Sequence, residues 1–149
     1  MAIVVVDDHL LRDVLAGQRT ADLDGLAPDG TATTGWWLFR LCSSFAAPRV
    51  SGKLSAPVAL LPTELQQSFL AQITALPTSI TVLSMRDLAW PMAQLRARHR
   101  GNGHSLSAAM VEALAAAHAL DGSLAVSRHD VGPNLKAAAE ADGIEFRTL

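Results

Sequence analysis

A short run of β-branched residues, Ile3-Val4-Val5-Val6, is followed at once by two aspartates, Asp7 and Asp8. A continuous apolar run of this length is typical of a parallel strand that is buried on both faces. Carboxylates that come directly after such a strand lie at the carboxyl edge of the sheet, where open α/β proteins bind their ligands. The N-terminus therefore predicts an α/β fold with an acidic site at one edge of its sheet.

Strand-like and helix-like segments alternate along the rest of the chain. Further strands are predicted at residues 31–34, 80–83, 123–127 and 144–147. Helices are predicted at residues 9–16, 35–46, 62–76, 85–99, from Ser105 or Ser107 to near Leu120, and 133–142. Residues 18–30, rich in Asp, Gly and Thr, are expected to form a connector, and residues 47–61 are expected to be irregular. This order predicts a three-layer α/β/α sandwich with a four- or five-stranded, mainly parallel sheet. We expect a single domain over residues 1–149, because a chain of this length can bury one core.

Composition excludes several classes of protein. Half of the residues are hydrophobic, which argues against disorder, and a net charge of −2 gives no overall basic footprint for nucleic acid. Cys42 is the only cysteine, so neither an intrachain disulfide nor a cysteine metal cluster can form. The first apolar run is too short for a secretory signal or a membrane span, so we expect a cytoplasmic protein without a membrane partner.

Two more acids stand in settings comparable to that of the N-terminal pair. Glu112 lies in a helix whose interior is otherwise almost wholly apolar, where a carboxylate is costly without a partner. A metal ion, an arginine or the mouth of a cleft would each justify it, as would a narrow solvent-facing stripe. Asp130 follows the strand at 123–127 and is either a ligand or an ordinary turn or cap residue. For Asp7 and Asp8 the alternative is likewise an ordinary role, as a helix cap and a solvated turn residue.

Together these acids predict a site for a divalent cation. Mg²⁺ prefers oxygen ligands and is usually held by one or two carboxylates, water and substrate phosphate. The candidate metal ligands are Asp7, Asp8, Glu112 and Asp130. They come from separate stretches of the chain, so they can meet only if their strands and helix share one edge of the sheet.

Three segments of the chain resemble proteins of the PIN-domain family. The opening Val5-Val6-Asp7-Asp8-His9-Leu10-Leu11 is similar to the family's first strand, which ends in Asp and leads into a leucine-rich helix. The stretch from Glu112 to Arg128 resembles its Ala-rich helix headed by an acid, followed by a strand with a Ser/Thr-Arg exit. Residues 135–145 resemble its terminal helix and strand.

The resemblance implies a metal-dependent ribonuclease, in which clustered acids and Mg²⁺ or Mn²⁺ activate a water that hydrolyses RNA. Asp7 falls on the family's first acid, Glu112 on the third in place of the usual Asp, and Asp130 close to the fourth; these three are the candidate catalytic residues. The second acid has no match, because residues 33–40 contain no carboxylate. The chain is interpreted as a weak, toxin-like ribonuclease or as a catalytically inactive PIN-like module that binds RNA or protein. An antitoxin-like partner and a homodimer are also expected.

Other features support alternative functions. Arg96, Arg98 and Arg100 form a basic cluster that could contact RNA phosphates, and Arg128 is a weaker candidate for the same role. Solvated helix ends also collect cations. Trp36 and Trp37 could stack on bases, although adjacent helical positions cannot share one face, so core and rim positions are favoured. The start also resembles a response-regulator receiver, but no acid occurs between Asp29 and Glu64 to accept a phosphoryl group.

Overall fold

The computed structural model describes residues 2–18, 21–46, 52–129 and 132–149. In these residues five strands form one parallel sheet in the order β3-β2-β1-β4-β5. The strands are β1 Ile3–Val6, β2 Gly30–Thr33, β3 Ile80–Val82, β4 Ser123–Val126 and β5 Phe146–Thr148. The prediction of a mainly parallel sheet is confirmed, and every strand pairing in the sheet is in fact parallel. Because β1 is central, the two aspartates that follow it lie near the middle of the carboxyl edge.

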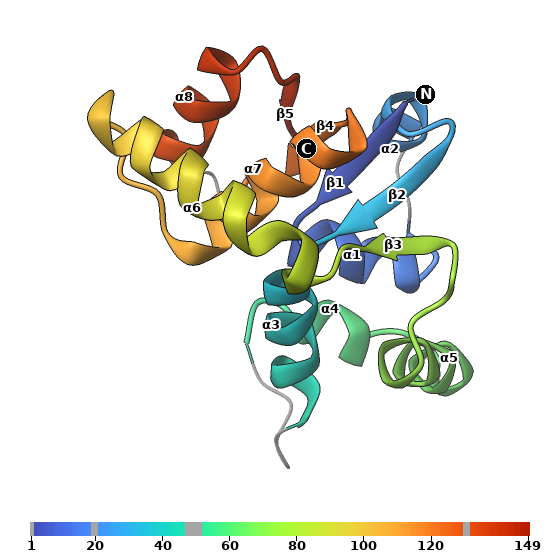
Figure 1. Ribbon diagram of the computed structural model, residues 1–149. Coiled ribbons are helices and arrows are strands. Elements are labelled where there is room, and N and C mark those ends of the chain that lie inside the picture. The colour runs from blue at the N-terminus through green and yellow to red at the C-terminus, as the bar shows by residue number, and fades with distance from the viewer. Residues whose placement is uncertain (1, 19–20, 47–51, 130–131) are drawn as a thin grey trace.

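Helices connect the strands and cover both faces of the sheet (Figure 1). They are α1 Asp8–Leu15, α2 Ala21–Leu26, α3 Gly35–Ala46, α4 Ala56–Ala59, α5 Thr63–Thr74, α6 Met85–Gly101, α7 Ala108–Leu120 and α8 Pro133–Ala141. Helix α4 lies in the segment that was expected to be irregular, and this expectation was wrong; helix α2 lies in the segment that was expected to be a connector. Both helices are short, and each buries one side chain, Leu23 in α2 and Val58 in α4. Helix propensity is a weak guide when tertiary burial decides.

The sheet separates two hydrophobic cores. Val5 belongs to the core under α6, α7 and α8, whereas Val4 and Val6 belong to the core under α1, α2, α4 and α5. This alternation is what the period of two in a strand requires, and all three valines are fully buried. Helix α3 contributes Trp37 to the first core and Leu41 to the second. The β-branched run is therefore buried on both faces, as predicted.

The tight turn between α7 and β4 has no room for a side chain at Gly122. Asp121 caps the helix in the left-handed conformation, with φ 49°, and Gly122 follows directly. A Cβ on Gly122 would lie 2.6 Å from the carbonyl oxygen of Ile3. The close approach sets α7, and with it Glu112, against the central strand. None of the helices in the described part of the chain has the length and apolar character needed to cross a bilayer.

Candidate acidic site

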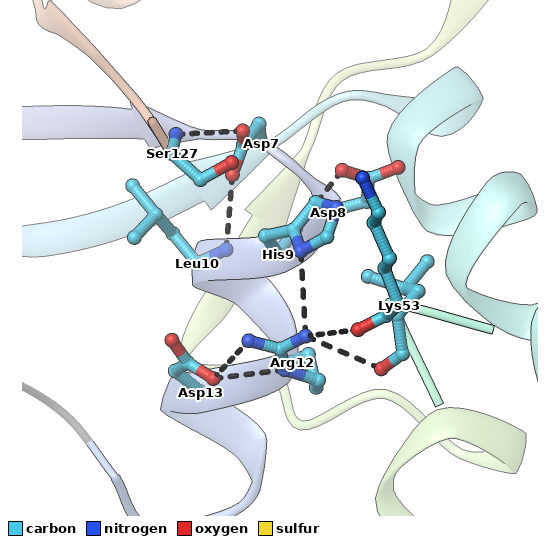
Figure 2. Close-up of polar contacts among 9 residues, drawn as sticks. Asp7, Asp8, His9, Leu10, Arg12, Asp13, Lys53 and Ser127 are labelled. Carbon is cyan, nitrogen blue, oxygen red and sulfur yellow. Dashed lines mark hydrogen bonds and ion pairs between the residues drawn. The ribbon is translucent and has the colours of Figure 1, made fainter. Parts of the chain in front are cut away.

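Asp7 closes the central strand and begins the first helix. It is the N-cap of α1 and is fully buried. Its Oδ1 accepts a hydrogen bond of 2.9 Å from the Leu10 amide, and its Oδ2 accepts one of 2.8 Å from the Ser127 amide at the end of β4 (Figure 2). Asp is a preferred N-cap because its carboxylate satisfies amides that have no partner within the helix. Asp7 thereby joins the exits of two neighbouring strands.

Burial changes the acidity of this carboxyl group. The pKa of Asp7 is raised to about 6: loss of hydration is the main cause, the negative charge of Asp8 acts in the same direction, and the hydrogen bonds from Leu10 and Ser127 oppose the shift. When burial disfavours the ionised form of a carboxyl group, a nearby cation stabilises that form. Such a group at a sheet edge is therefore suited to binding a metal ion or to exchanging a proton near neutral pH.

Asp8 is also fully buried, but its surroundings differ from those of Asp7. It is the first residue of α1, and its Oδ1 accepts a hydrogen bond of 2.9 Å from the His9 amide. Its Oδ2 lies 3.2 Å from Nε of Arg40 on α3. The charge of Asp8 is therefore compensated by a cation of the protein itself. This ion pair ties α1 to α3.

Glu112 is buried in α7, with only 4% of the residue exposed, so the alternative of a solvent-facing stripe is wrong. Its Oε1 accepts a hydrogen bond of 2.8 Å from the amide of Trp36 at the start of α3. A Cβ on Gly35 would lie 3.8 Å from both carboxylate oxygens, which is an ordinary van der Waals distance, so the approach of Glu112 does not depend on the glycine. Thr34 completes the helix cap, since its Oγ1 accepts from the Trp37 amide. Sequence reasoning missed the capping role of Thr34, although a Thr directly before a helix is a recognisable N-cap signal.

The structure places Asp7 and Glu112 at the same edge of the sheet. Asp7 stands at the exit of β1, and Glu112 reaches the exit of β2, its hydrogen-bonded neighbour. The hydroxyl of Thr33 joins the two exits by donating to the carbonyl oxygen of Val6 at 2.8 Å. The fourth candidate, Asp130, lies outside the described residues. The edge thus carries two buried carboxylates from distant parts of the sequence, with Asp8 engaged beside them.

This donor set does not form a closed metal cage. Among the described residues, no group of three or more His, Cys, Asp or Glu side chains is arranged to hold a metal ion. Mg²⁺ needs only one or two protein carboxylates, because it retains water and takes phosphate oxygens. Asp7 and Glu112 are therefore the described residues that could supply carboxylates to a water-rich magnesium site, and the described acids do not form a site made by protein ligands alone.

A buried arginine in the last turn of α1 joins this helix to the loop before α4, and sequence reasoning missed it. Arg12 is buried, and its Nη1 donates to the carbonyl oxygens of Lys53 and Leu54 at 3.2 and 3.3 Å. The same nitrogen lies 3.3 Å from Nδ1 of His9 (Figure 2). The signal that could have found Arg12 was its place one turn after Asp8 on an amphipathic helix. These groups fix the loop before α4 against the acidic edge.

Of the candidate phosphate-binding arginines, Arg128 follows the exit of β4, whereas Arg96, Arg98 and Arg100 belong to α6. Arg98 makes a two-pronged ion pair with Asp142, at 2.6 and 3.0 Å, and so serves as a structural link. Arg96, Arg100 and Arg128 are exposed to solvent. The geometry gives no reason to prefer any one of them as an RNA contact.

The described residues define a PIN-like α/β/α fold with an acidic carboxyl edge. A solved structure described as "Structure of FitAB bound to IR36 DNA fragment" is similar, with a TM-score of 0.58 and 18% sequence identity. The similarity covers 97% of this chain and 94% of the FitAB chain. No protein-family model matches the sequence, and no curated protein matches it. At this identity the likeness establishes the fold alone.

Proposed function

We propose that this chain is the PIN-like toxin of a toxin–antitoxin pair and that it hydrolyses single-stranded RNA with Mg²⁺ or Mn²⁺. The observation that carries the proposal is the convergence of two buried carboxylates, Asp7 and Glu112, at one sheet edge. FitAB, whose fold is similar, is a toxin–antitoxin system with a PIN-domain toxin. The fold and the acids support the same class of function from independent directions.

Each residue of the edge has a distinct role in this proposal. Asp7 and Glu112 would hold the cation, and Asp130 would add a third carboxylate by its place after β4. The bound ion would supply an activated water and stabilise charge on the phosphate. Asp8 is a positioning residue, because its pairing with Arg40 holds α3, which presents the Trp36 amide to Glu112. Asp7 is ionised and ready for a cation above about pH 6.

A second candidate is a PIN-like module that binds RNA or a protein partner without cleaving RNA. The observation that favours it is that each buried acid of the edge is already engaged, by Arg40 or by backbone amides. In this case Asp7 and Glu112 are helix caps. An antitoxin-like partner, and a homodimer of this chain, are compatible with both candidates.

Metal binding and RNA cleavage distinguish the two candidates. Mn²⁺ at millimolar concentration is expected to raise the melting temperature and to permit cleavage of a single-stranded RNA. Asp7→Asn and Glu112→Gln should each lower the cleavage rate at least about 100-fold, since even outer partners of metal ligands contribute 10- to 100-fold. Glu145→Gln, on an exposed side chain that pairs with Arg147, is the matched control and should cleave normally.

The opposite result has an equally clear meaning. A protein whose melting temperature is unchanged by Mn²⁺ and which leaves RNA intact is not a metal-dependent nuclease. Retention of RNA or partner affinity in Asp7→Asn would then support the binding module.

A further inference from the structure

Two aromatic side chains stand exposed on the helix that Glu112 caps. Trp36 is 46% exposed and Phe39 is 62% exposed, whereas Trp37 between them is buried in the core. Trp36 and Phe39 are three residues apart on α3, so they share one face. Their ring centroids are 6.0 Å apart, and the ring planes are inclined by 44°. The pair forms an open aromatic corner next to the acidic edge.

This corner is one wall of a hollow of about 390 Å³. The hollow is lined by Gly35, Trp36, Phe39, Leu83, Met85 and Glu112. Its volume is near the lower end of the range for small-molecule sites, so it suits one planar group and is small for the face of a helix. Its walls are apolar apart from one carboxylate, and its lining contains no cation. A phosphate would be repelled here, and a neutral ring would be accepted.

We propose that this hollow binds one unpaired base of a single-stranded RNA. Aromatic side chains stack on the face of any base, which gives affinity without sequence preference. Without a bound cation, the carboxylate of Glu112 disfavours a phosphate group inside the hollow, so the base enters it and the sugar-phosphate chain stays outside. Trp36 thereby contributes twice: its ring stacks on the base, and its amide holds Glu112 in place. The choice of RNA as the ligand rests on the proposed function.

The test measures RNA binding without cleavage. A short fluorescein-labelled oligouridylate is titrated with the full chain in EDTA, and binding is followed by fluorescence anisotropy. Trp36→Ala and Phe39→Ala should each weaken binding at least about fivefold, which is the lower bound for loss of one stacked base. Trp36→Phe should restore most of the affinity. Trp90→Ala removes a ring that is 71% exposed on α6 and should leave binding unchanged.

Trp36→Ala leaves the backbone amide in place, so loss of affinity would not reflect loss of the bond to Glu112. Unchanged melting temperatures would show that both variants fold, and Phe39→Ala alone suffices if Trp36→Ala does not. Wild-type affinity in the alanine variants would overturn the inference, as would a wild-type protein that does not bind RNA. If an antitoxin-like protein then binds through Trp36 and Phe39, the hollow belongs to that partner.

The result is separable from the proposed function. RNA binding that depends on Trp36, in a protein that never cleaves RNA, would uphold the inference and reject the hydrolysis. Metal-dependent cleavage by a protein whose Trp36→Ala variant binds RNA normally would uphold the hydrolysis and reject the inference.

Discussion

Asp7, Asp8 and Glu112 show how one functional group takes different roles from its surroundings. All three carboxylates are buried. Asp8 has Arg40 as its partner, whereas Asp7 and Glu112 accept hydrogen bonds from backbone amides. Burial raises the pKa of Asp7 to about 6. Because loss of hydration makes its charged form costly, Asp7 gains from an added cation.

The raised pKa of Asp7 predicts a characteristic dependence of stability on pH. Because the folded protein holds this proton more tightly than the unfolded chain, the stabilisation is complete below about pH 4 and is lost as pH rises through about 6. A shift from 3.8 to about 6 corresponds to about 3 kcal/mol. Urea unfolding in EDTA should therefore show that Asp7→Asn loses less stability between pH 4 and pH 7 than the wild type does. Parallel curves for the two proteins would show that Asp7 does not titrate abnormally.

At the scale of elements, one carboxylate links the ends of three helices. Asp142 follows α8, and its side chain is 2% exposed. It pairs with Arg98 and His99 at the end of α6 and with His118 near the end of α7, at 2.6, 3.1 and 2.7 Å. Burial opposes ionisation, but the hydrogen bonds from Arg98, His118 and His99 hold the pKa of Asp142 well below its usual range. Arg98, one member of the basic cluster at residues 96–100, thus serves to connect helices.

Asp142→Asn should weaken this link between helices. Loss of charged hydrogen bonds is expected to lower the free energy of unfolding by about 1.5–3 kcal/mol at pH 7. Because the native pKa of Asp142 is depressed, the contribution is present above about pH 4 and fades as pH falls below it. Urea denaturation at both pH values measures the effect. Glu140→Gln, an exposed acid on α8, is the control and should change stability by no more than about 0.5 kcal/mol.

For the whole molecule, the order of the strands sets both stability and the position of the site. The central strand β1 pairs with β2 and with β4, whereas β3 and β5 lie at the edges. Ligand sites of open α/β folds form where the carboxyl ends of strands meet. The same arrangement that buries β1 most deeply places Asp7 in the middle of that edge.

Hydrogen exchange should reflect this order. The amides of Val5 and Val6 are expected to be among the slowest to exchange, because β1 is paired on both sides and fully buried. The amides of β5, a three-residue edge strand whose residues are partly or fully exposed, should exchange faster. Exchange followed by mass spectrometry of peptic fragments tests this. Equal or reversed protection of β1 and β5 would contradict the assigned order.

Much of the fold was predictable because its signals are local. The run from Ile3 to Val6 is short and β-branched and was therefore predicted as a buried strand, and the helix over 35–46 was predicted with its observed bounds. Helices α2 and α4 were not predictable, since each depends on one side chain buried by distant elements. The helix predicted over 85–99 continues for two more residues and ends at Gly101. Local propensity fails where packing supplies the larger free energy.

The sequence by itself determined that buried strands alternate with helices and that acids follow the first of them, because periodicity and β-branching are written in adjacent residues. Only the tertiary structure decided that Glu112 meets the exit of β2, that Arg40 neutralises Asp8 and that Trp36 faces solvent while Trp37 does not. These outcomes depend on contacts between residues far apart in the chain. The charge and binding partners of a carboxylate depend on the groups packed around it, and the linear sequence does not show which groups these are.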